Sequence, residues 1–405
     1  MRAPSKGPSR KGLTVALVVL LLVTLPLTSV NGREEGVDFY YRGELERLDK
    51  GLGPGTAGAP VRMMYDKTGE RVLIQGREGV DDLRVLDNDL NTLAVLEPPY
   101  EDFHVSGAIM SWYGERVITW GRTPFNSTDV VVTYNLTHFE PEPGYLPTGT
   151  IPLVEIDHIN LMGDGIILVV GGRDGNGTNR LLFIETTTKR EMKNDTIPGN
   201  REVMYIGHDG VKMIVALEGG MVLVYQTRDW GFETSFQVFD DAFTAIDIKP
   251  RTDWFFGNAD GDVVGFTFYA HMEFQNMTMK RGPVQGIYSV ERFRHQAVAS
   301  PGEGSGSLLT VWMYNGEGWV IESSSMTDRP VTSLVGDPMH DTTFAACLDD
   351  GSIEFYMIVL VEEELEPPKE TWWEKHWMNA VMIGILILAA LVLLVLVRGR
   401  KADGD

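Results

Sequence analysis

Residues 253–269 read Asp-Trp-Phe-Phe-Gly-Asn-Ala-Asp-Gly-Asp-Val-Val-Gly-Phe-Thr-Phe-Tyr. A short apolar run leads into a turn at 257–261, and a second run of alternating and β-branched residues follows. Two such runs around a turn that contains Gly and Asp are typical of an antiparallel β-hairpin. Variants of this unit recur along most of the chain, so the sequence predicts a fold built from repeats.

The apolar strand that opens this hairpin has seven copies at intervals of roughly 45 residues, a spacing typical of propeller blades. The copies lie at 71–76, 116–121, 166–171, 212–217, 253–258, 295–300 and 342–347. We expect preceding strands at 61–66, 105–111, 154–162, 202–208, 243–249, 284–290 and 331–336, and following strands at 82–87, 129–135, 180–185, 221–226, 262–268, 307–314 and 352–358. The runs are short, β-branched and bounded by Gly, Asp or Asn, which argues against helices. The predicted fold is therefore all-β, a seven-bladed β-propeller over residues 33–361, because blades around an axis cover one another's faces.

The last copy leaves little room for an outer strand. It runs from Ile353 through Val361 directly into three glutamates at 362–364. A lone strand-like segment, 37–41, stands before the first copy. We expect this segment to complete the last blade and close the ring, although it could also be a loose lead-in.

Two hairpin turns carry a resemblance to known propellers. Asp260-Gly261-Asp262-Val263 and Asp350-Gly351-Ser352-Ile353 each follow an apolar strand of small residues. These turns resemble the third-strand entry of WD-repeat and quinoprotein-like β-propellers, and the resemblance spans about residues 37–361. No copy carries the Trp-Asp dipeptide, and Gly207-His208 ends a strand instead of opening a repeat. The resemblance implies the propeller architecture with degenerate repeats, and it implies no particular ligand.

The charge is uneven along the chain, whose formal net charge is −22. Basic residues precede the apolar stretch 13–30, in the layout of a secretory signal. We expect a signal peptide over 1–32, with Val30 and Gly32 at the −3 and −1 positions, or else an uncleaved anchor. The body between the two ends is acidic, which argues against a nucleic-acid footprint.

Near the other end, residues 378–397 form an apolar stretch without a formal charge. As a helix it would be about 30 Å long, which matches a bilayer core. We expect interface anchors on its two sides at Trp372, Trp373, Trp377, Arg398, Arg400 and Lys401. The expected order is an acidic, Trp-rich linker (362–377), a transmembrane α-helix (378–397) and a cytoplasmic tail (398–405). A single-pass protein of the cell membrane, with the propeller outside the cytoplasm, is the predicted arrangement.

Five Asn-x-Ser/Thr sequons agree with an outside location. They are at Asn126, Asn135, Asn176, Asn194 and Asn276, in or beside segments expected to be polar loops. The single cysteine, Cys347, lies in an apolar strand and is expected to be a buried thiol.

No catalytic constellation stands out in the sequence. The eight histidines form no metal motif, and one cysteine is too few for a thiolate-based metal site. Three acidic turns, at 87–91, 174–178 and 258–262, contain possible calcium ligands, but hairpin turns require the same residues. Exposed aromatic residues could form a sugar- or peptide-binding face, or they pack between blades: Trp112, Tyr113, Trp230, Trp254 and Trp319. We expect no catalytic, metal or cofactor site.

The predicted function is non-catalytic binding of a protein or glycan partner by a membrane-anchored scaffold. A rigid external fold with long variable loops and no catalytic constellation favours this class. Two alternatives stay open at this point. One is an enzyme, either a quinone-dependent dehydrogenase or a glycoside-cleaving propeller, and the other is an accessory subunit of a membrane complex.

Overall fold

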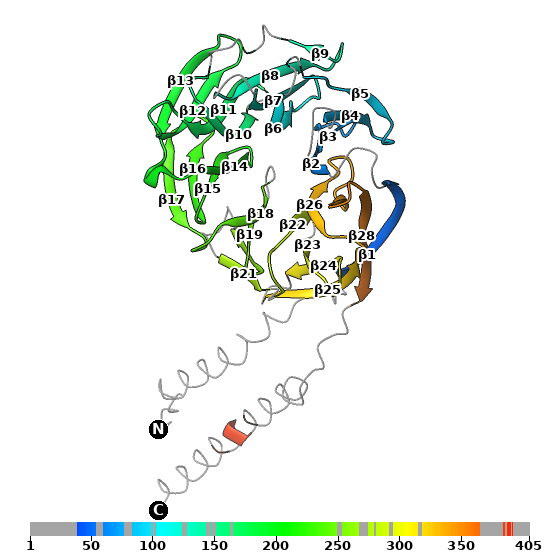
Figure 1. The fold of residues 1–405 in the computed structure, drawn as a ribbon. Helices are drawn as coiled ribbons and strands as arrows, with labels where there is room; N and C mark the ends of the chain where they lie inside the picture. The colour runs from blue at the N-terminus through cyan, green and yellow to red at the C-terminus, as the bar shows by residue number, and fades with distance from the viewer. Residues whose placement is uncertain are drawn as a thin grey trace, which may run out of the picture. The chain divides into compact units, whose positions relative to one another are not determined.

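The computed structural model describes residues 39–53, 60–76, 83–98, 100, 103–123, 128–142, 146, 151–162, 165–248, 253–266, 274–278, 281–290, 295–314, 318–364, 384, 387–389 and 391. The chain divides into two compact units, Arg42–Val361 and a second one made of Met1–Tyr41 with Glu362–Asp405. In the described part of the first unit, seven four-stranded sheets stand as blades around a common axis (Figure 1). The predicted seven-bladed propeller is thereby confirmed.

The strands fall into four sets by distance from the axis. Inner strands are β2 (Pro60–Tyr65), β6 (His104–Met110), β10 (Glu155–Met162), β14 (Val203–His208), β18 (Phe243–Asp247), β22 (Gly286–Val290) and β26 (Val331–Gly336). Second strands are β3 (Arg71–Gly76), β7 (Arg116–Arg122), β11 (Ile167–Arg173), β15 (Lys212–Leu217), β19 (Trp254–Asn258), β23 (His295–Pro301) and β27 (Thr343–Leu348). Third strands are β4 (Leu83–Asp87), β8 (Val130–Asn135), β12 (Asn179–Glu185), β16 (Met221–Gln226), β20 (Asp262–Phe266), β24 (Ser307–Tyr314) and β28 (Ile353–Glu364). Outer strands are β5 (Thr92–Val95), β9 (Glu140–Pro141), β13 (Arg190–Thr196), β17 (Phe232–Gln237), β21 (Phe274–Thr278), β25 (Trp319–Met326) and β1 (Phe39–Leu52), and a 3-10 turn, η1 (Pro198–Asn200), joins blades 3 and 4.

The apolar second strands lie where the sequence predicts them, with ends that differ by at most two residues. Their burial explains the success. The side chains of β15, for example, are buried at five of six positions. Strands that are buried on both faces are continuous apolar runs, and these are the strongest strand signal that a sequence carries.

The ring closes through blade 7, whose strand order is β1-β28-β27-β26. The expected closure by the N-terminal segment is confirmed, but the closing strand runs to Leu52, well past the predicted 37–41. Alternating charges hid this extension, because Glu44 and Glu46 are exposed while Leu45 packs inward. Strand β28 also continues to Glu364, three residues into the segment predicted as a linker.

Strand β1 also contacts blade 6. Glu322 of β25 accepts a hydrogen bond from the Gly43 amide, and its Oε2 lies 3.0 Å from Nε2 of the buried His295. Ser323 Oγ accepts a second bond from the Leu45 amide at 3.1 Å. A Cβ on Gly43 would come within 2.8 Å of the His295 ring, so a glycine is required for this close approach. These contacts fix the last blade against its neighbour.

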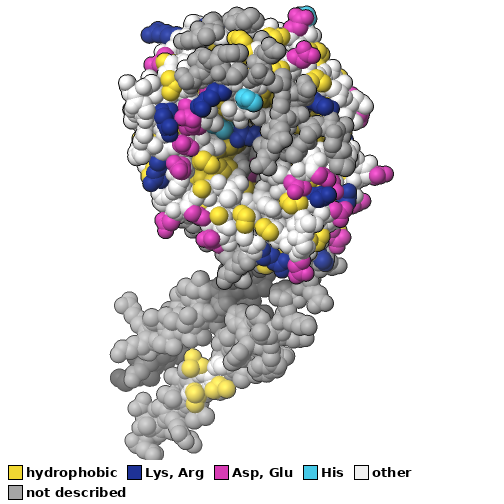
Figure 2. Space-filling model, viewed as in Figure 1, with side chains coloured by type: hydrophobic (Ala, Val, Ile, Leu, Met, Phe, Trp, Pro, Cys, Tyr) yellow, Lys and Arg dark blue, Asp and Glu magenta, His cyan; other side chains and the backbone are white. Residues whose placement is uncertain are grey.

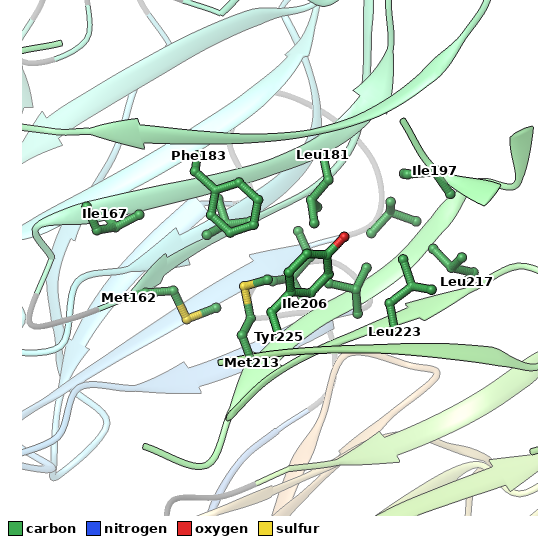
Figure 3. Packing of buried hydrophobic residues seen from close by; sticks show 13 residues of the cluster. Met162, Ile167, Leu181, Phe183, Ile197, Ile206, Met213, Leu217, Leu223 and Tyr225 are labelled. Atoms are coloured by element: carbon green, nitrogen blue, oxygen red, sulfur yellow. The ribbon is translucent and has the colours of Figure 1, made fainter. Parts of the chain in front are cut away.

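The hydrophobic core lies between blades. Figure 3 shows one such cluster, in which side chains of blade 3 such as Leu181 and Phe183 face Ile206, Met213 and others of blade 4. Each of the five is almost completely buried. Burial of this kind contributes about 25 cal/mol per Å² of apolar surface, and it links each blade to the next.

Cys347 lies in β27 and is fully buried as a free thiol, as expected. Burial raises its pKa to about 11, so the thiol stays protonated. Among the residues that the structure describes, no helix is long and apolar enough to cross a membrane. The predicted transmembrane stretch 378–397 lies outside them except for Gly384, 387–389 and Leu391, which are helical.

Candidate functional site

The propeller has two chemically different faces. Every outer strand leads into the inner strand of the next blade, so all inner strands begin at one face and end at the other. We call the first the mouth face. The second is the turn face, since the inner strands end there in tight turns such as 66–71, 111–116 and 209–212.

At the mouth face, six of the seven inner strands carry a β-bulge at the same place. In each, one extra residue has no partner in the second strand: Val61, Ser106, Asp157, Met204, Thr244 and Thr332. A bulge increases the local twist and re-aims the side chain next to it. The sequence gave no sign of these bulges, because the extra residues share no composition.

The residue after each bulge stands at one common level of the ring. These residues are Arg62, Gly107, His158, Tyr205, Ala245 and Ser333. Large polar side chains come from blades 1, 3 and 4, and small ones from blades 2, 5 and 7. The ring of Trp120 fills the space above Gly107, where a Cβ would approach it to 2.1 Å. We call the set Arg62, His158 and Tyr205 the channel triad.

Aromatic contacts hold the imidazole of this triad in place. The His158 ring lies 5.3 Å from the Tyr205 ring and 6.0 Å from the Trp120 ring, measured between centroids. Burial lowers the pKa of His158 to about 3, and the charge of Arg62 acts in the same direction. The imidazole is therefore neutral at physiological pH, and its buried Nδ1 has no hydrogen-bond partner in the described part of the chain.

The other two members respond to the same surroundings. Burial raises the pKa of Tyr205 to about 12, the Asp247 carboxylate also raises it, and Arg62 opposes them. Arg62 is exposed to solvent, yet removal from bulk water lowers its pKa. Exposure together with partial desolvation is expected for a side chain lining a narrow, wet channel. Figure 2 shows the viewed face of the ring hollowed near its centre, with hydrophobic side chains gathered around the hollow.

The mouth face also carries a chain of ion pairs across blades 2 to 4. Arg122 pairs with Asp129 and Glu155 at 3.1 and 3.2 Å, and Arg173 pairs with Glu155 and Glu202 at 3.2 and 3.4 Å. Most of these side chains are substantially exposed. They form a hydrated network of both signs, which contributes little to stability.

At the turn face, a polar side chain at the end of the inner strand caps the turn in four blades. Asp66, Ser111, Asp209 and Asp337 occupy this place, and each accepts backbone amide hydrogen bonds from its own turn. Asp209 also reaches the next blade, where its Oδ2 accepts a bond from the buried Trp254 indole at 3.0 Å. The repeated Asp or Ser was visible in the sequence as a signal at the strand ends.

Neighbouring turns on this face interlock. The Lys67 amide donates to the Trp112 carbonyl at 2.8 Å, and its ammonium lies 4.9 Å from the Trp112 ring centroid. That ring lies 5.6 Å from the His208 ring of blade 4. Four side chains at the tips of the turns are apolar and more than half exposed: Tyr113, Ile166, Val211 and Met339.

The predicted glycosylation sites lie apart from the channel. Asn135 ends β8, and Asn176 is exposed in the β11–β12 turn. Asn194 and Asn276 lie within the outer strands β13 and β21, so the expectation of a loop was wrong for these two. Asn194 is nevertheless exposed, because outer strands have a wet face. Asn126 lies outside the described residues, as do the predicted membrane-interface anchors Trp372, Trp373, Trp377, Arg398, Arg400 and Lys401.

The other candidates are structural in the described part of the molecule. Trp254 is buried, Trp230 and Trp319 pack against core clusters, and only Tyr113 of the aromatic set is largely exposed. In two acidic turns the carboxylate accepts amide hydrogen bonds of its own loop, at Asp87 and Asp174. Among the described residues, no group of three acidic, His or Cys side chains could hold a metal ion.

Comparison with known proteins identifies the fold and no family. No family model matches the chain, and no curated protein matches it. The β-propeller domain of Cps50 (Swd1) from Myceliophteria thermophila is similar, with a TM-score of 0.56 and 11% identity over 78% of this chain and 100% of that one. A chain of the mitotic checkpoint complex has a TM-score of 0.61 and 12% identity, over 81% and 96%. At these identities the likeness shows the propeller fold alone.

Proposed function

We propose that this protein is a membrane-anchored, extracytoplasmic scaffold that binds a protein or glycan partner without catalysis. One observation carries the proposal: the chain joins and leaves the propeller at the same face. A ring tethered from one face leaves the other free to meet a partner. The apolar stretches 13–30 and 378–397 supply a signal or anchor and a membrane helix in this proposal.

The position of both junctions follows from blade 7. The Ile358 amide of β28 donates to the Thr342 carbonyl at 2.8 Å, which lies in the turn before β27 and hence at the turn face. Gly43 of β1 lies beside Ile358, and Gly51 lies beside Ile353. The two strands therefore run in opposite directions, with the start of β1 and the end of β28 both at the turn face. We propose that the turn face is nearest the bilayer and that the mouth face points away from it.

The mouth face offers the chemistry of recognition. It presents the bulge residues, the channel triad and the chain of ion pairs, whereas the turn face is occupied by capped and interlocked turns. The two solved structures named above are similar in fold, and one of them belongs to a multiprotein complex, the mitotic checkpoint complex. A protein-binding role for this propeller is in keeping with that likeness.

Cysteine labelling in intact cells tests the location. The only native thiol, Cys347, is fully buried, so the wild-type background is low. Ser106→Cys introduces a thiol at the exposed mouth face, and Thr137→Cys introduces one beside the β8–β9 turn on the turn-face side. A membrane-impermeant maleimide should label both variants in intact cells. Labelling that requires cell lysis would overturn the extracytoplasmic placement.

Photocrosslinking tests the binding role. A photoreactive amino acid at Ser106 or Thr244 on the mouth face should give discrete crosslinked products in native membranes, and the same group at Tyr113 on the turn face should not. Purified full-length protein should at the same time show no turnover in a substrate screen. Turnover without any mouth-face crosslink would contradict the scaffold proposal.

A further inference from the structure

The channel triad leaves several hydrogen-bonding groups without a protein partner. Neither the Arg62 guanidinium nor the Tyr205 hydroxyl makes a hydrogen bond or ion pair in the part of the chain that the structure describes, and His158 Nδ1 is buried and unpaired. Buried polar groups are nearly always hydrogen-bonded, and a partly desolvated cation without a counter-ion is costly. Three such groups at one level, contributed by three separate blades, indicate a site built for a ligand.

The nearby carboxylates are engaged elsewhere. Asp247 is the acid that acts on Tyr205, and its Oδ2 accepts the Ser289 amide of blade 6 at 2.7 Å. Asp157 precedes His158, but its Oδ2 accepts the Val203 amide of blade 4 at 3.0 Å. Neither carboxylate forms an ion pair with Arg62. The positive charge of Arg62 therefore remains available in the channel.

The donor set matches an anion of single charge. A guanidinium presents a planar fork of N–H groups that binds a carboxylate through two parallel hydrogen bonds. The protonated Tyr205 phenol and the neutral His158 imidazole each have one donor to add. Only one of these three groups is charged. The acidic body of the protein and the carboxylates of the mouth face also disfavour multiply charged anions such as phosphates.

We propose that Arg62, His158 and Tyr205 form a carboxylate-binding site in the channel at the mouth face. The carboxylate belongs either to a small free acid or to a protein partner that inserts an acidic side chain or its C-terminus into the channel. Its charge would offset that of Arg62, and its second oxygen would accept hydrogen bonds from the phenol and the imidazole. The site goes beyond the proposed scaffold role and does not depend on membrane anchoring.

Calorimetric titration of the purified full-length chain in detergent tests this site. One arm uses acetate and benzoate as free acids, and the other uses a short peptide with a free C-terminal carboxylate, with the C-terminally amidated peptide as its control. Binding of the free acids identifies a small-molecule site, and binding of the carboxylate peptide alone identifies a docking site for a chain end. The absence of heat from every carboxylate at 10-fold molar excess over about 1 mM, a weak-binding limit, would overturn the proposal.

Three variants separate the site from the rest of the mouth face. Arg62→Gln should weaken carboxylate binding by about 10-fold or more, and Tyr205→Phe by roughly 3-fold to 10-fold, as expected for the loss of a charged and of a neutral hydrogen bond. Arg173→Gln removes a cation from the same face outside the channel and should leave binding unchanged. Equal binding by wild type and Arg62→Gln would contradict the assignment.

Thermal unfolding supplies a second readout that does not need the right ligand. Arg62→Gln removes a partly desolvated charge that has no counter-ion, so the ligand-free variant should unfold at a higher temperature than wild type. The carboxylate-induced rise in the unfolding temperature should be present in wild type and absent in this variant. A ligand-free Arg62→Gln variant that is less stable than wild type would show that the guanidinium has an internal structural partner, which would overturn the site.

Discussion

The two faces of the propeller are built for different tasks. On the turn face, Asp and Ser side chains are used up in capping tight turns, and one of them, Asp209, also ties two blades together. On the mouth face, bulges interrupt the inner ladders, ion pairs stand in solvent, and the channel triad keeps its donors free. The difference teaches that one face holds the ring together while the other is free to recognise a ligand. Substitutions at matched positions can break or sharpen this contrast.

The largest effect is expected on the turn face, at Asp209. Replacement by Ala removes the acceptor of the Val211 and Lys212 amides and of the buried Trp254 indole. An unsatisfied buried donor costs about 1–3 kcal/mol, and three bonds are lost, so Asp209→Ala should destabilise the protein by roughly 3 kcal/mol. Urea unfolding of the purified chain, followed by tryptophan fluorescence, measures the change.

Asp209→Asn is the matched control, because its amide oxygen can still accept hydrogen bonds. It should cost less than half as much as Asp209→Ala. Equal losses for the two variants would show that the carboxylate charge, and not its role as an acceptor, stabilises the turn.

The next effect is expected at a bulge on the mouth face. Gly172 of β11 lies against the bulged part of β10, and a Cβ there would come within 2.1 Å of the Glu155 carbonyl oxygen. The neighbour is backbone and cannot rotate away, so Gly172→Ala should destabilise by about 2–3 kcal/mol. Gly318→Ala, where an added Cβ meets nothing within 4 Å, should change the free energy of unfolding by less than about 0.5 kcal/mol. Comparable losses at both positions would mean that the bulge does not impose the glycine.

Strand positions could be read from the sequence because the second strands are buried on both faces. β15 and β19 are continuous apolar runs between turn residues, and such runs need no knowledge of the fold. The outer strand β1 was harder. Its charged residues face water, and its inward residues Leu45, Leu48 and Leu52 do not follow a strict alternation. Only its partner β28 makes that segment a strand.

The channel triad could not be found from the sequence. Arg62, His158 and Tyr205 lie in three different repeats, and nothing in their local sequence marks them as neighbours. They reach one level because each follows a bulge, and a bulge is a property of the register between two strands. An alignment of the copies on their apolar strands identifies the blades, but it does not show which residues share a level.

A smaller effect of opposite sign is expected at Asp157 on the mouth face. Burial raises the pKa of this carboxyl to about 6, the charges of Glu202 and Glu155 add to the rise, and the hydrogen bond from Val203 opposes it. The folded protein then binds the proton up to a higher pH than the unfolded chain does, whose Asp pKa is about 3.9. Stability therefore falls as the pH rises from about 4 to about 6, and the full penalty is present above that range.

Asp157→Asn removes this penalty and keeps an acceptor for the Val203 amide. At pH 7 the variant should be more stable than wild type by about 1 kcal/mol, a value reduced for the partial exposure of the side chain. The advantage should vanish near pH 4. Unfolding curves collected between pH 4 and 8 provide the measurement, and a constant difference across this range would exclude a titrating carboxyl as its cause.

The smallest effect is expected in the chain of ion pairs on the mouth face. The partners of Arg173, Glu155 and Glu202, are well exposed, so Arg173→Ala should cost no more than about 0.5 kcal/mol and should cost still less in 0.5 M salt. Arg122→Ala is the matched test, because its partner Asp129 has a side chain that is only 4% exposed. Loss of Arg122 leaves that carboxylate with the Ile156 amide as its remaining hydrogen-bond donor, so the cost should reach about 1 kcal/mol and resist salt. If Arg173→Ala were the more damaging of the two, the ion pairs of the mouth face would be structural, and the division of labour between the faces would fail.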